Sequence, residues 1–472
     1  MRNNAAEIDP GSFRDPGGRV FLSAGRVFRT VTGANTRAFE AARDAGVYDR
    51  LARKGLLLDL TELDAGDLPQ GSADIAAGAD HILEHPRIPF LSYPYEWSFA
   101  AHRAAALLHL DLHLEALDAG FTLSDATAYN VQFIGTKPVF IDHLSLHPYE
   151  DGELWTGHRQ FCMQFLNPLL FWHLLETPPN PWFRGSLEGI SPEDMAPLLS
   201  LRNRMSWTVF THVVMQAALQ KKAIGGGRKT DDAVRATRLP RQSFLGMLMG
   251  LRSYIAKMQP PKAPTVWGDY AQHNSYERSE AERKRDFVKD MVSKVKPGLM
   301  FDIGCNTGDY SDAALDAGAG YVVGFDYDHG ALDIAFDRFA KSGRPFLPLW
   351  LDAANPSPAQ GWAQRERKGL GERGNADALV ALAFIHHIVI GRNVPLSMAI
   401  DWLTGLAPTG IIEFPPKSDP MVQRLLALRE DIFPDYTEEA LLAVLGERAK
   451  IVASEHVSEN GRLLVWYDRR AG

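Results

Sequence analysis

The chain has 472 residues and a formal net charge of −8, with 45% hydrophobic and 23% charged residues. This length predicts two or three domains, and the composition is that of an ordinary globular protein. Two cysteines are too few for a disulfide framework or a cysteine-based zinc site, and the negative charge argues against broad nucleic-acid binding. No apolar run reaches membrane-spanning length, and the start of the chain lacks a signal peptide's apolar core. We therefore expect a cytoplasmic protein without a membrane partner.

The N-terminal part of the chain predicts a flexible segment over residues 1–18 and then a domain over residues 19–255. Within this domain we expect a long helix over 98–119. Two apolar runs, 131–134 and 138–142, are joined by a short turn and predict a hairpin.

Polar residues between this helix and hairpin have the spacing of a kinase catalytic loop. Asp125 precedes Asn130 by five positions, and Asp142 follows the hairpin; these residue types serve there as base and magnesium ligands. The segment resembles the loops of aminoglycoside phosphotransferases and protein kinases. No glycine-rich phosphate loop precedes it, and Arg29 occupies the place of the expected lysine. We expect an α+β kinase-like accessory domain without activity; turn-capping roles for Asp125 and Asn130 remain the simpler alternative.

Three histidines, His102, His109 and His113, fall on one face of the helix predicted over 98–119. Such a face permits metal binding, but histidines packed on a core-facing helix are commoner. No glutamate follows His109 in the pattern of a zinc protease. We therefore expect no metal site.

A proline-containing stretch predicts an interdomain linker over 256–266, followed by a second domain over 267–472. The charged run 277–296 predicts an amphipathic helix that packs Phe287 and Met291 inward.

The most informative segment is 299–308, where an apolar run breaks into a turn containing two glycines. A strand that opens into a glycine loop and then a helix presents backbone N–H groups to a small cofactor. A nicotinamide fingerprint needs further glycines where this chain has Asn306 and Asp309. Asp309 also begins the next helix, where it would repel a pyrophosphate. The loop therefore favours a ligand without phosphates, such as S-adenosylmethionine (SAM).

Three successive apolar runs end in, or just before, a carboxylate: 299–302, 321–326 and 346–351. Asp326 follows Asp302 at close to the roughly 20-residue spacing that places a carboxylate on ribose hydroxyls. We expect Asp302 to hold the amino group of the methionyl tail, and Asp352 to meet the adenine amino group. The other residues expected at the cofactor belong to the turn or flank the domain's start: Tyr270, Gly304, Cys305, Asn306 and Gly308.

The rest of the chain continues this alternation of strands and helices. Strands are expected over 378–383 and 411–414, helices over 395–406, 421–428 and 438–445, and a closing hairpin over 451–456 and 463–467. This pattern matches the seven-stranded, Rossmann-like α/β sheet of SAM-dependent methyltransferases.

Several motifs carry a resemblance to a known family: residues 267–270, 302–308, 355–358, 381–387, 413–417 and 429–433. With them, nearly the whole chain resembles class I SAM-dependent methyltransferases of the nodulation-protein NoeA type. The resemblance implies methyl transfer from SAM and leaves the acceptor open.

His386 and His387 come just after the fourth strand, at the edge of the sheet where ligands bind. One of them is our candidate for a general base or acceptor-positioning group, unless it simply bonds a loop backbone. Glu413 is expected to orient that histidine, and Lys417 to hold an anionic acceptor. The acceptor atom is expected to be an O or N of a small metabolite, glycan or peptide. The alternative function is a kinase-like phosphotransferase, or a binding module, fused to a regulatory methyltransferase-like domain.

Overall fold

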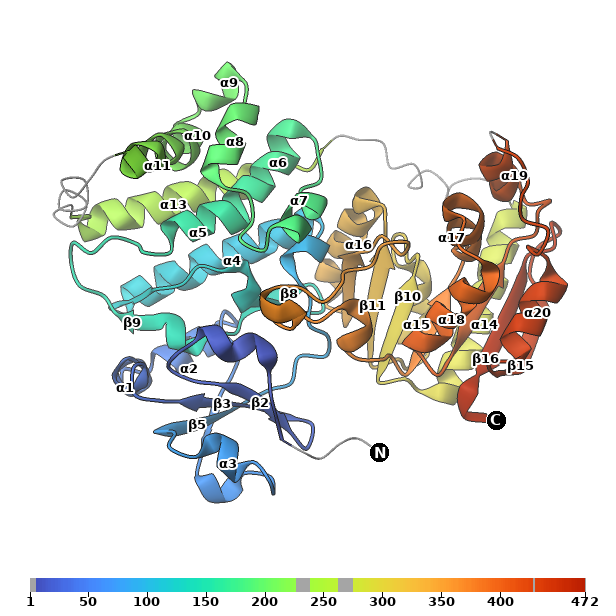
Figure 1. The fold of residues 1–472 in the computed structure, drawn as a ribbon, viewed down its shortest axis with the longest axis horizontal. Coiled ribbons are helices and arrows are strands. Elements are labelled where there is room, and N and C mark those ends of the chain that lie inside the picture. The colour runs from blue at the N-terminus through green and yellow to red at the C-terminus, as the bar shows by residue number, and fades with distance from the viewer. Residues whose placement is uncertain (1–5, 226–237, 262–274, 428, 472) are drawn as a thin grey trace. The chain divides into compact units, whose positions relative to one another are not determined.

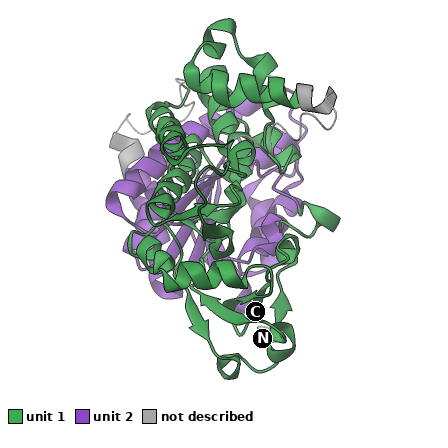
Figure 2. Cartoon of the chain, turned by 90° about the vertical axis from the view of Figure 1, so that its left-hand side faces the viewer, with its two compact units in different colours: residues 1–133, 137–262, 359–367 green, residues 134–136, 263–358, 368–472 purple. Residues whose placement is uncertain are grey.

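The computed structural model describes residues 6–225, 238–261, 275–427 and 429–471 (Figure 1). The chain forms two compact units (Figure 2). Unit 1 comprises residues 1–133, 137–262 and 359–367, and unit 2 comprises residues 134–136, 263–358 and 368–472.

Unit 1 begins with an antiparallel sheet in the order β1-β2-β3-β5-β4. Its strands are Glu7–Ile8, Val20–Ser23, Arg26–Val31, Thr61–Leu63 and His81–His85, numbered in chain order. The structure departs here from the flexible segment expected over 1–18, because β1 pairs with β2. Arg14 of the 3₁₀ helix η1 (Pro10–Arg14) also pairs with Glu366 at 2.6 Å. Ladder hydrogen bonds and an ion pair therefore order this end of the chain.

The central helix of unit 1 is α4 (Phe99–Asp118), in agreement with the helix predicted over 98–119. His102, His109 and His113 are buried on it, and the His109 ring lies 5.4 Å from the Phe161 ring. Two two-stranded sheets follow, β6 (Phe121–Leu123) with β9 (Leu146–Pro148), and the hairpin of β7 (Val131–Ile134) with β8 (Lys137–Phe140). The second of these is the hairpin expected over 131–142.

The remaining helices of unit 1 are mostly short. They are α1 (Thr36–Asp44), α2 (Val47–Arg53), α3 (Ala73–Ala76), α5 (His158–Phe161), α6 (Asn167–Leu175), α7 (Asn180–Gly185), α8 (Pro192–Leu198), α9 (Leu201–Arg204), α10 (Trp207–Val209), α11 (Met215–Gly225) and α13 (Arg241–Lys257). Two π-helical turns, η6 (Cys162–Leu166) and η7 (Phe210–Val214), continue α5 and α10 into α6 and α11.

Unit 2 contains a seven-stranded sheet in the order β12-β11-β10-β13-β14-β16-β15. The strands are β10 (Leu299–Ile303), β11 (Tyr321–Asp326), β12 (Phe346–Trp350), β13 (Ala378–Ala381), β14 (Thr409–Phe414), β15 (Lys450–His456) and β16 (Leu463–Asp468). β10 to β14 are parallel, and β16 runs antiparallel to both β14 and β15. Each strand and the closing hairpin were predicted from the sequence. Unit 2 therefore has the Rossmann-like methyltransferase fold, closed by the antiparallel hairpin.

The helices of unit 2 are α14 (Ser275–Val295), α15 (Asp309–Asp316), α16 (His329–Ser342), α17 (Ile385–Arg392), α18 (Leu396–Leu406), α19 (Pro420–Leu426) and α20 (Glu438–Gly446). Val288, Leu332 and Phe339 from α14 and α16 share one buried cluster with Met300 and Val322 of the sheet. Strand order reverses between β10 and β13, and right-handed crossovers then place the following helices on the opposite face. Accordingly α17, α18 and α20 pack with one another as a second group.

Within the described residues, no helix combines the length and the apolar character needed to cross a bilayer.

Candidate functional site

The turn after β10 is held in shape by hydrogen bonds to the backbone of β11. The N–H groups of Gly304 and Cys305 donate to the carbonyl of Phe325, at 2.7 and 3.0 Å. Gly304 and Gly308 have φ angles of 84° and 85°, a region that favours glycine. A Cβ on Gly308 would also lie 2.7 Å from the Phe339 ring. The turn lies beside the point where strand order reverses, which is where open α/β sheets bind ligands.

Asp326 joins this turn to the end of β11. One of its carboxylate oxygens accepts from the Asn306 N–H at 2.8 Å, and the other accepts from the Asp328 N–H at 2.8 Å. Burial raises the pKa of Asp326. Because each carboxylate oxygen accepts more than one hydrogen bond, ribose hydroxyls remain compatible with these contacts.

Asp302 lies at the end of β10 and is 1% exposed. It accepts a 2.6 Å hydrogen bond from the Ser311 hydroxyl of α15. Burial raises its pKa to about 7, and the negative charges of Asp326 and Asp309 act in the same direction. Among the described residues no lysine or arginine forms an ion pair with Asp302. A ligand ammonium would supply the missing positive charge.

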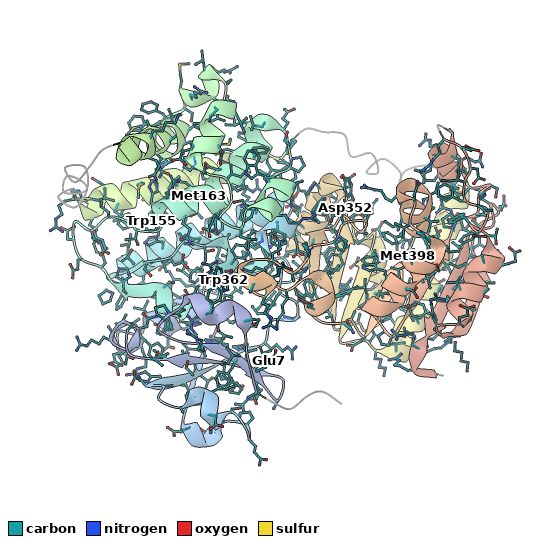
Figure 3. The ribbon with its side chains drawn as sticks, in the orientation of Figure 1. Glu7, Trp155, Met163, Asp352, Trp362 and Met398 are labelled. Atoms are coloured by element: carbon teal, nitrogen blue, oxygen red, sulfur yellow. The ribbon has the colours of Figure 1, made fainter. Side chains whose placement is uncertain are left out.

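The third acid, Asp352, follows β12 and is labelled in Figure 3. It accepts from the Ala354 N–H at 3.1 Å and lies 3.5 Å from the Arg392 guanidinium.

The aromatic residue after Asp326 was not singled out from the sequence. Tyr327 is 61% exposed, and its carbonyl accepts from the Trp350 indole N–H at 3.1 Å. An aromatic directly after a strand-terminal acid was the available signal.

The two candidate histidines begin α17, and their ring centroids lie 4.1 Å apart. His386 is 1% exposed, and neither ring nitrogen has a hydrogen-bond partner in the part of the chain that the structure describes. Burial, followed by the effect of His387, lowers the pKa of His386 to about 2. His387 is half-buried, and burial lowers its pKa too. Both rings are therefore neutral near pH 7, and His386 is a very weak base.

Glu413 does not hydrogen-bond His386. Its carboxylate accepts from the Ala383 N–H at 2.7 Å and pairs with Lys284 at 2.8 Å and with Arg462 at 3.1 Å. Side chains along β14 alternate between the two faces of the sheet, and the Glu413 side chain lies on the face that α14 covers. Lys284 of α14 therefore reaches Glu413. Glu413 is thus a structural acid that fixes the backbone in front of α17.

Ala383 itself has a φ of 49°, because the chain bends sharply after β13, which ends at Ala381.

Lys417 pairs with Asp431 at 2.7 Å. The lysine proposed to hold an anionic acceptor therefore already has an acidic partner. Cys305 is 3% exposed within the apolar core, and Tyr270 lies outside the described residues.

A relative was found among characterised proteins. The nodulation protein NoeA of Rhizobium meliloti (strain 1021) is 46% identical over 462 residues, which cover 97% of this chain and 95% of that protein. The chain belongs to the NoeA family. No protein-family model matches the chain.

Several solved structures are similar to this NoeA-family chain over less than half of its length. Magnesium protoporphyrin IX methyltransferase (ChlM) from Synechocystis PCC 6803, with bound SAH, is 20% identical with a TM-score of 0.31. The match covers 43% of this chain and 91% of that one. N-methyltransferase NodS from Bradyrhizobium japonicum WM9 is 14% identical with a TM-score of 0.30, over 41% of this chain and 97% of that one.

In unit 1 of this NoeA-family chain, the structure brings together the polar residues singled out by their kinase-like spacing. The Asn130 amide donates to Asp125 at 3.1 Å and to Asp142 at 3.2 Å. Arg29 of β3 pairs with Asp142 at 2.8 Å and also with Asp15. Burial raises the pKa of Asp125. The turn between β2 and β3 is only Ala24-Gly25, so it forms no glycine-rich phosphate loop.

Proposed function

We propose that unit 2 binds S-adenosylmethionine and transfers its methyl group to an O or N atom of a small metabolite, glycan or peptide. The observation that carries this proposal is Asp302, a buried acid without a basic partner among the described residues, beside a glycine turn at the sheet's switch point. ChlM and NodS, two solved structures that are similar to this chain at low identity, are methyltransferases.

The residues present fit this cofactor. The Asp302 carboxylate would accept from the methionyl ammonium, which restores charge balance at a buried acid. The Asp326 carboxylate would accept from the ribose hydroxyls. Asp352 would accept from the adenine amino group, and the exposed ring of Tyr327 would stack on the adenine.

The cofactor supplies an activated methyl group on a positively charged sulfur. A lone pair of the acceptor atom attacks the methyl carbon while the carbon–sulfur bond breaks and its electron pair returns to sulfur. The protein's task is to align the acceptor and to exclude water. If the acceptor carries a proton, that proton must leave to a base or to water.

His387 is the better candidate for that base. His386 is almost fully buried, with its pKa lowered to about 2, so it would take up a proton poorly. His387 is half-buried and adjacent to it, and its neutral imidazole can accept a proton. We assign His386 to packing beneath His387.

The cofactor part of this proposal is tested by isothermal titration calorimetry of the purified protein with SAM. We expect binding that falls at least about tenfold in Asp326→Ala, because ribose contacts and the turn's anchor are lost together. Asp337→Asn, on the exposed side of α16, is the matched control and should bind like the wild type. Wild-type protein that takes up no SAM would contradict the proposal.

The acceptor is tested by incubating the protein with methyl-labelled SAM and a cell extract, then locating the label. We expect the label on a small molecule, glycan or peptide, and much less of it with His387→Gln than with His386→Gln. Label on RNA would contradict the acceptor class.

For unit 1 we propose a kinase-like accessory domain that helps to recognise the substrate and transfers no phosphate. Asn130 bridges Asp125 and Asp142, which is the constellation that a phosphotransferase would use. Arg29, however, is bound to two carboxylates, and the β2–β3 turn is too short to cradle phosphates. Titration with ATP and magnesium should give no binding. Binding that is lost in Asp142→Ala would instead support the phosphotransferase alternative.

A further inference from the structure

Two pairs of metal-binding side chains meet inside unit 1, away from the residues considered so far. His158 and Cys162 lie four positions apart across α5 and η6, and His212 and Gln216 lie four positions apart across η7 and α11. Side chains four positions apart share one helix face. The two faces meet, although the two histidines are separated by 54 positions in the chain.

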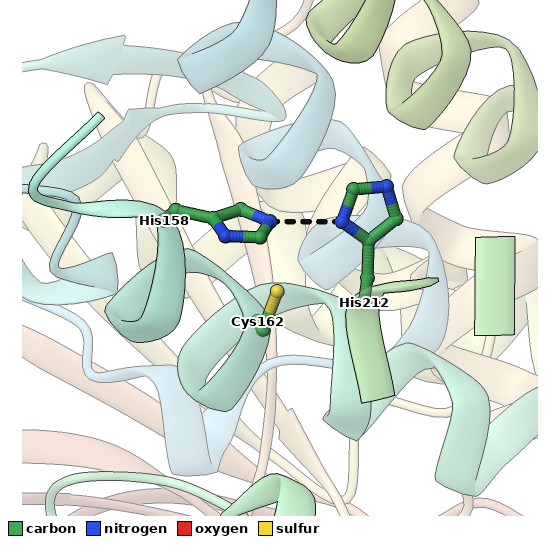
Figure 4. Close-up of side chains that lie close together, drawn as sticks. All are labelled: His158, Cys162 and His212. Carbon is green, nitrogen blue, oxygen red and sulfur yellow. Dashed lines mark hydrogen bonds between the residues drawn. The ribbon is translucent and has the colours of Figure 1, made fainter. Parts of the chain in front are cut away.

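The donor atoms of His158, Cys162 and His212 all lie within 4.8 Å of one another. The His158 Nε2 and His212 Nδ1 atoms are 2.8 Å apart, and the Cys162 sulfur points toward the gap between the two rings (Figure 4). Two imidazoles and a thiolate form a ligand set for zinc and neighbouring transition metals, and they are poor ligands for magnesium or calcium.

We infer that His158, Cys162 and His212 form a site for a divalent transition metal ion, with zinc the best match. Zn–N distances of about 2.0–2.1 Å in tetrahedral geometry separate two ligand nitrogens by roughly 3.3 Å. The two rings therefore need to part by only about half an ångström from their present hydrogen-bonded distance. Three protein ligands leave the fourth position to water.

Gln216 is positioned to support the bound state. Its amide nitrogen donates to His158 Nδ1 at 2.9 Å, and its carbonyl oxygen is buried without a hydrogen-bond partner. When His158 binds a metal through Nε2, its Nδ1 carries the proton and needs an acceptor. Rotation of the Gln216 amide by half a turn provides that acceptor and breaks no hydrogen bond of its oxygen.

The local structure agrees with such a site. Both paired segments contain a π-helical turn, a feature that often occurs at functional sites. The nearby Arg159 is paired with Glu193 at 2.8 Å. A bound ion would cross-link two helical segments of unit 1.

The experiment is a cobalt(II) titration of the full-length, metal-stripped protein, followed by its absorption spectrum. We expect one tight site with a thiolate-to-cobalt charge-transfer band that zinc abolishes by displacement. Cys162→Ser should lose that band, and His212→Gln should weaken cobalt binding at least about tenfold. Gln216→Leu should weaken it by about 10- to 100-fold.

His173→Gln is the matched control, because this histidine of α6 only contacts the backbone of Gln259. It should bind cobalt like the wild type. If Cys162→Ser fails to fold, the part-buried His212 and Gln216 variants decide the matter. Wild-type protein without the charge-transfer band, or an unchanged affinity in His212→Gln, would overturn the inference. These readouts do not depend on methyl transfer.

Discussion

Lys284 of α14 forms a 2.8 Å ion pair with Glu413 of β14, and both side chains are buried. Arg462 joins them from the turn before β16, and Arg462 also pairs with Asp419 at 2.7 Å. The pair ties the first helix of unit 2 to the strand whose end faces α17. Through the Ala383 N–H, Glu413 also fixes the bend that precedes the two histidines.

Lys284→Met should destabilise unit 2 by about 3 kcal/mol at pH 7, because Glu413 would keep a buried charge with one partner fewer. Burial acts to raise the pKa of Glu413, but the charges of Lys284 and Arg462 outweigh it and lower the pKa. The stabilisation is therefore present above the unfolded pKa of about 4.3 and is lost as the pH falls through the lower folded value. Urea unfolding at pH 7 and at pH 3 measures this. Lys289→Met, at a mostly exposed lysine 4.0 Å from Asp316, should cost less than about 1 kcal/mol.

Asp302 predicts how SAM binding depends on pH. Its pKa is raised to about 7 in the free protein, so its carboxyl group is protonated, and unable to pair with an ammonium, below that pH. SAM affinity should therefore rise between pH 5.5 and pH 7.5. Asp302→Asn should remove this dependence and weaken binding at least about tenfold at pH 7.5. Calorimetric titrations across this range measure both effects, and a pH-independent wild type would contradict the role of Asp302.

The raised pKa of Asp302 also predicts how the stability of the ligand-free protein depends on pH. Because its folded pKa lies above its unfolded value of about 3.9, the contribution of Asp302 to stability is full below that value. It is lost as the pH rises to about 7. The stability of Asp302→Asn relative to wild type should therefore improve from pH 4 to pH 8. Thermal unfolding without ligand tests this.

Tyr327→Ala should weaken SAM binding by about 5- to 150-fold, since an aromatic ring stacked on a base contributes about 1–3 kcal/mol. Tyr327→Phe keeps the ring and should bind like the wild type. The ring is 61% exposed in the free protein, so neither change should alter the melting temperature appreciably. Equal affinity in the alanine variant would remove Tyr327 from the site.

Gly308→Ala should destabilise unit 2 by about 2–4 kcal/mol and weaken SAM binding. Alanine is strained at the φ of 85°, and its Cβ would meet the Phe339 ring at 2.7 Å. Gly318→Ala is the control, because Gly318 has a φ of 102° but open space around its Cβ. The difference between the two unfolding free energies isolates the contact with Phe339.

Local patterns were sufficient to predict the strands of unit 2 and the turn after β10. An apolar run that ends in Asp302 and then breaks at glycine defines a strand end without knowledge of any distant residue. The flexible N-terminus was a different case. A polar stretch with few apolar residues looks unstructured, but strand pairing with β2 and the partner Glu366 order it.

The partners of Glu413 could not be read from the chain. Lys284 lies in a helix whose many charges look like a solvated face, and Arg462 lies in a hairpin turn. Only packing shows which of these charges is buried. The same holds for His158, Cys162 and His212, because each helical segment alone carries at most two potential ligands.

The sequence by itself therefore determined the order of the strands in unit 2, and the acids at or just after the ends of three of them. Periodicity and turn chemistry are properties of neighbouring residues, so a linear reading captures them. The tertiary structure alone decided which charges are buried together and which histidines meet. Those outcomes depend on which faces of distant elements pack against each other, and desolvation acts only once they have packed.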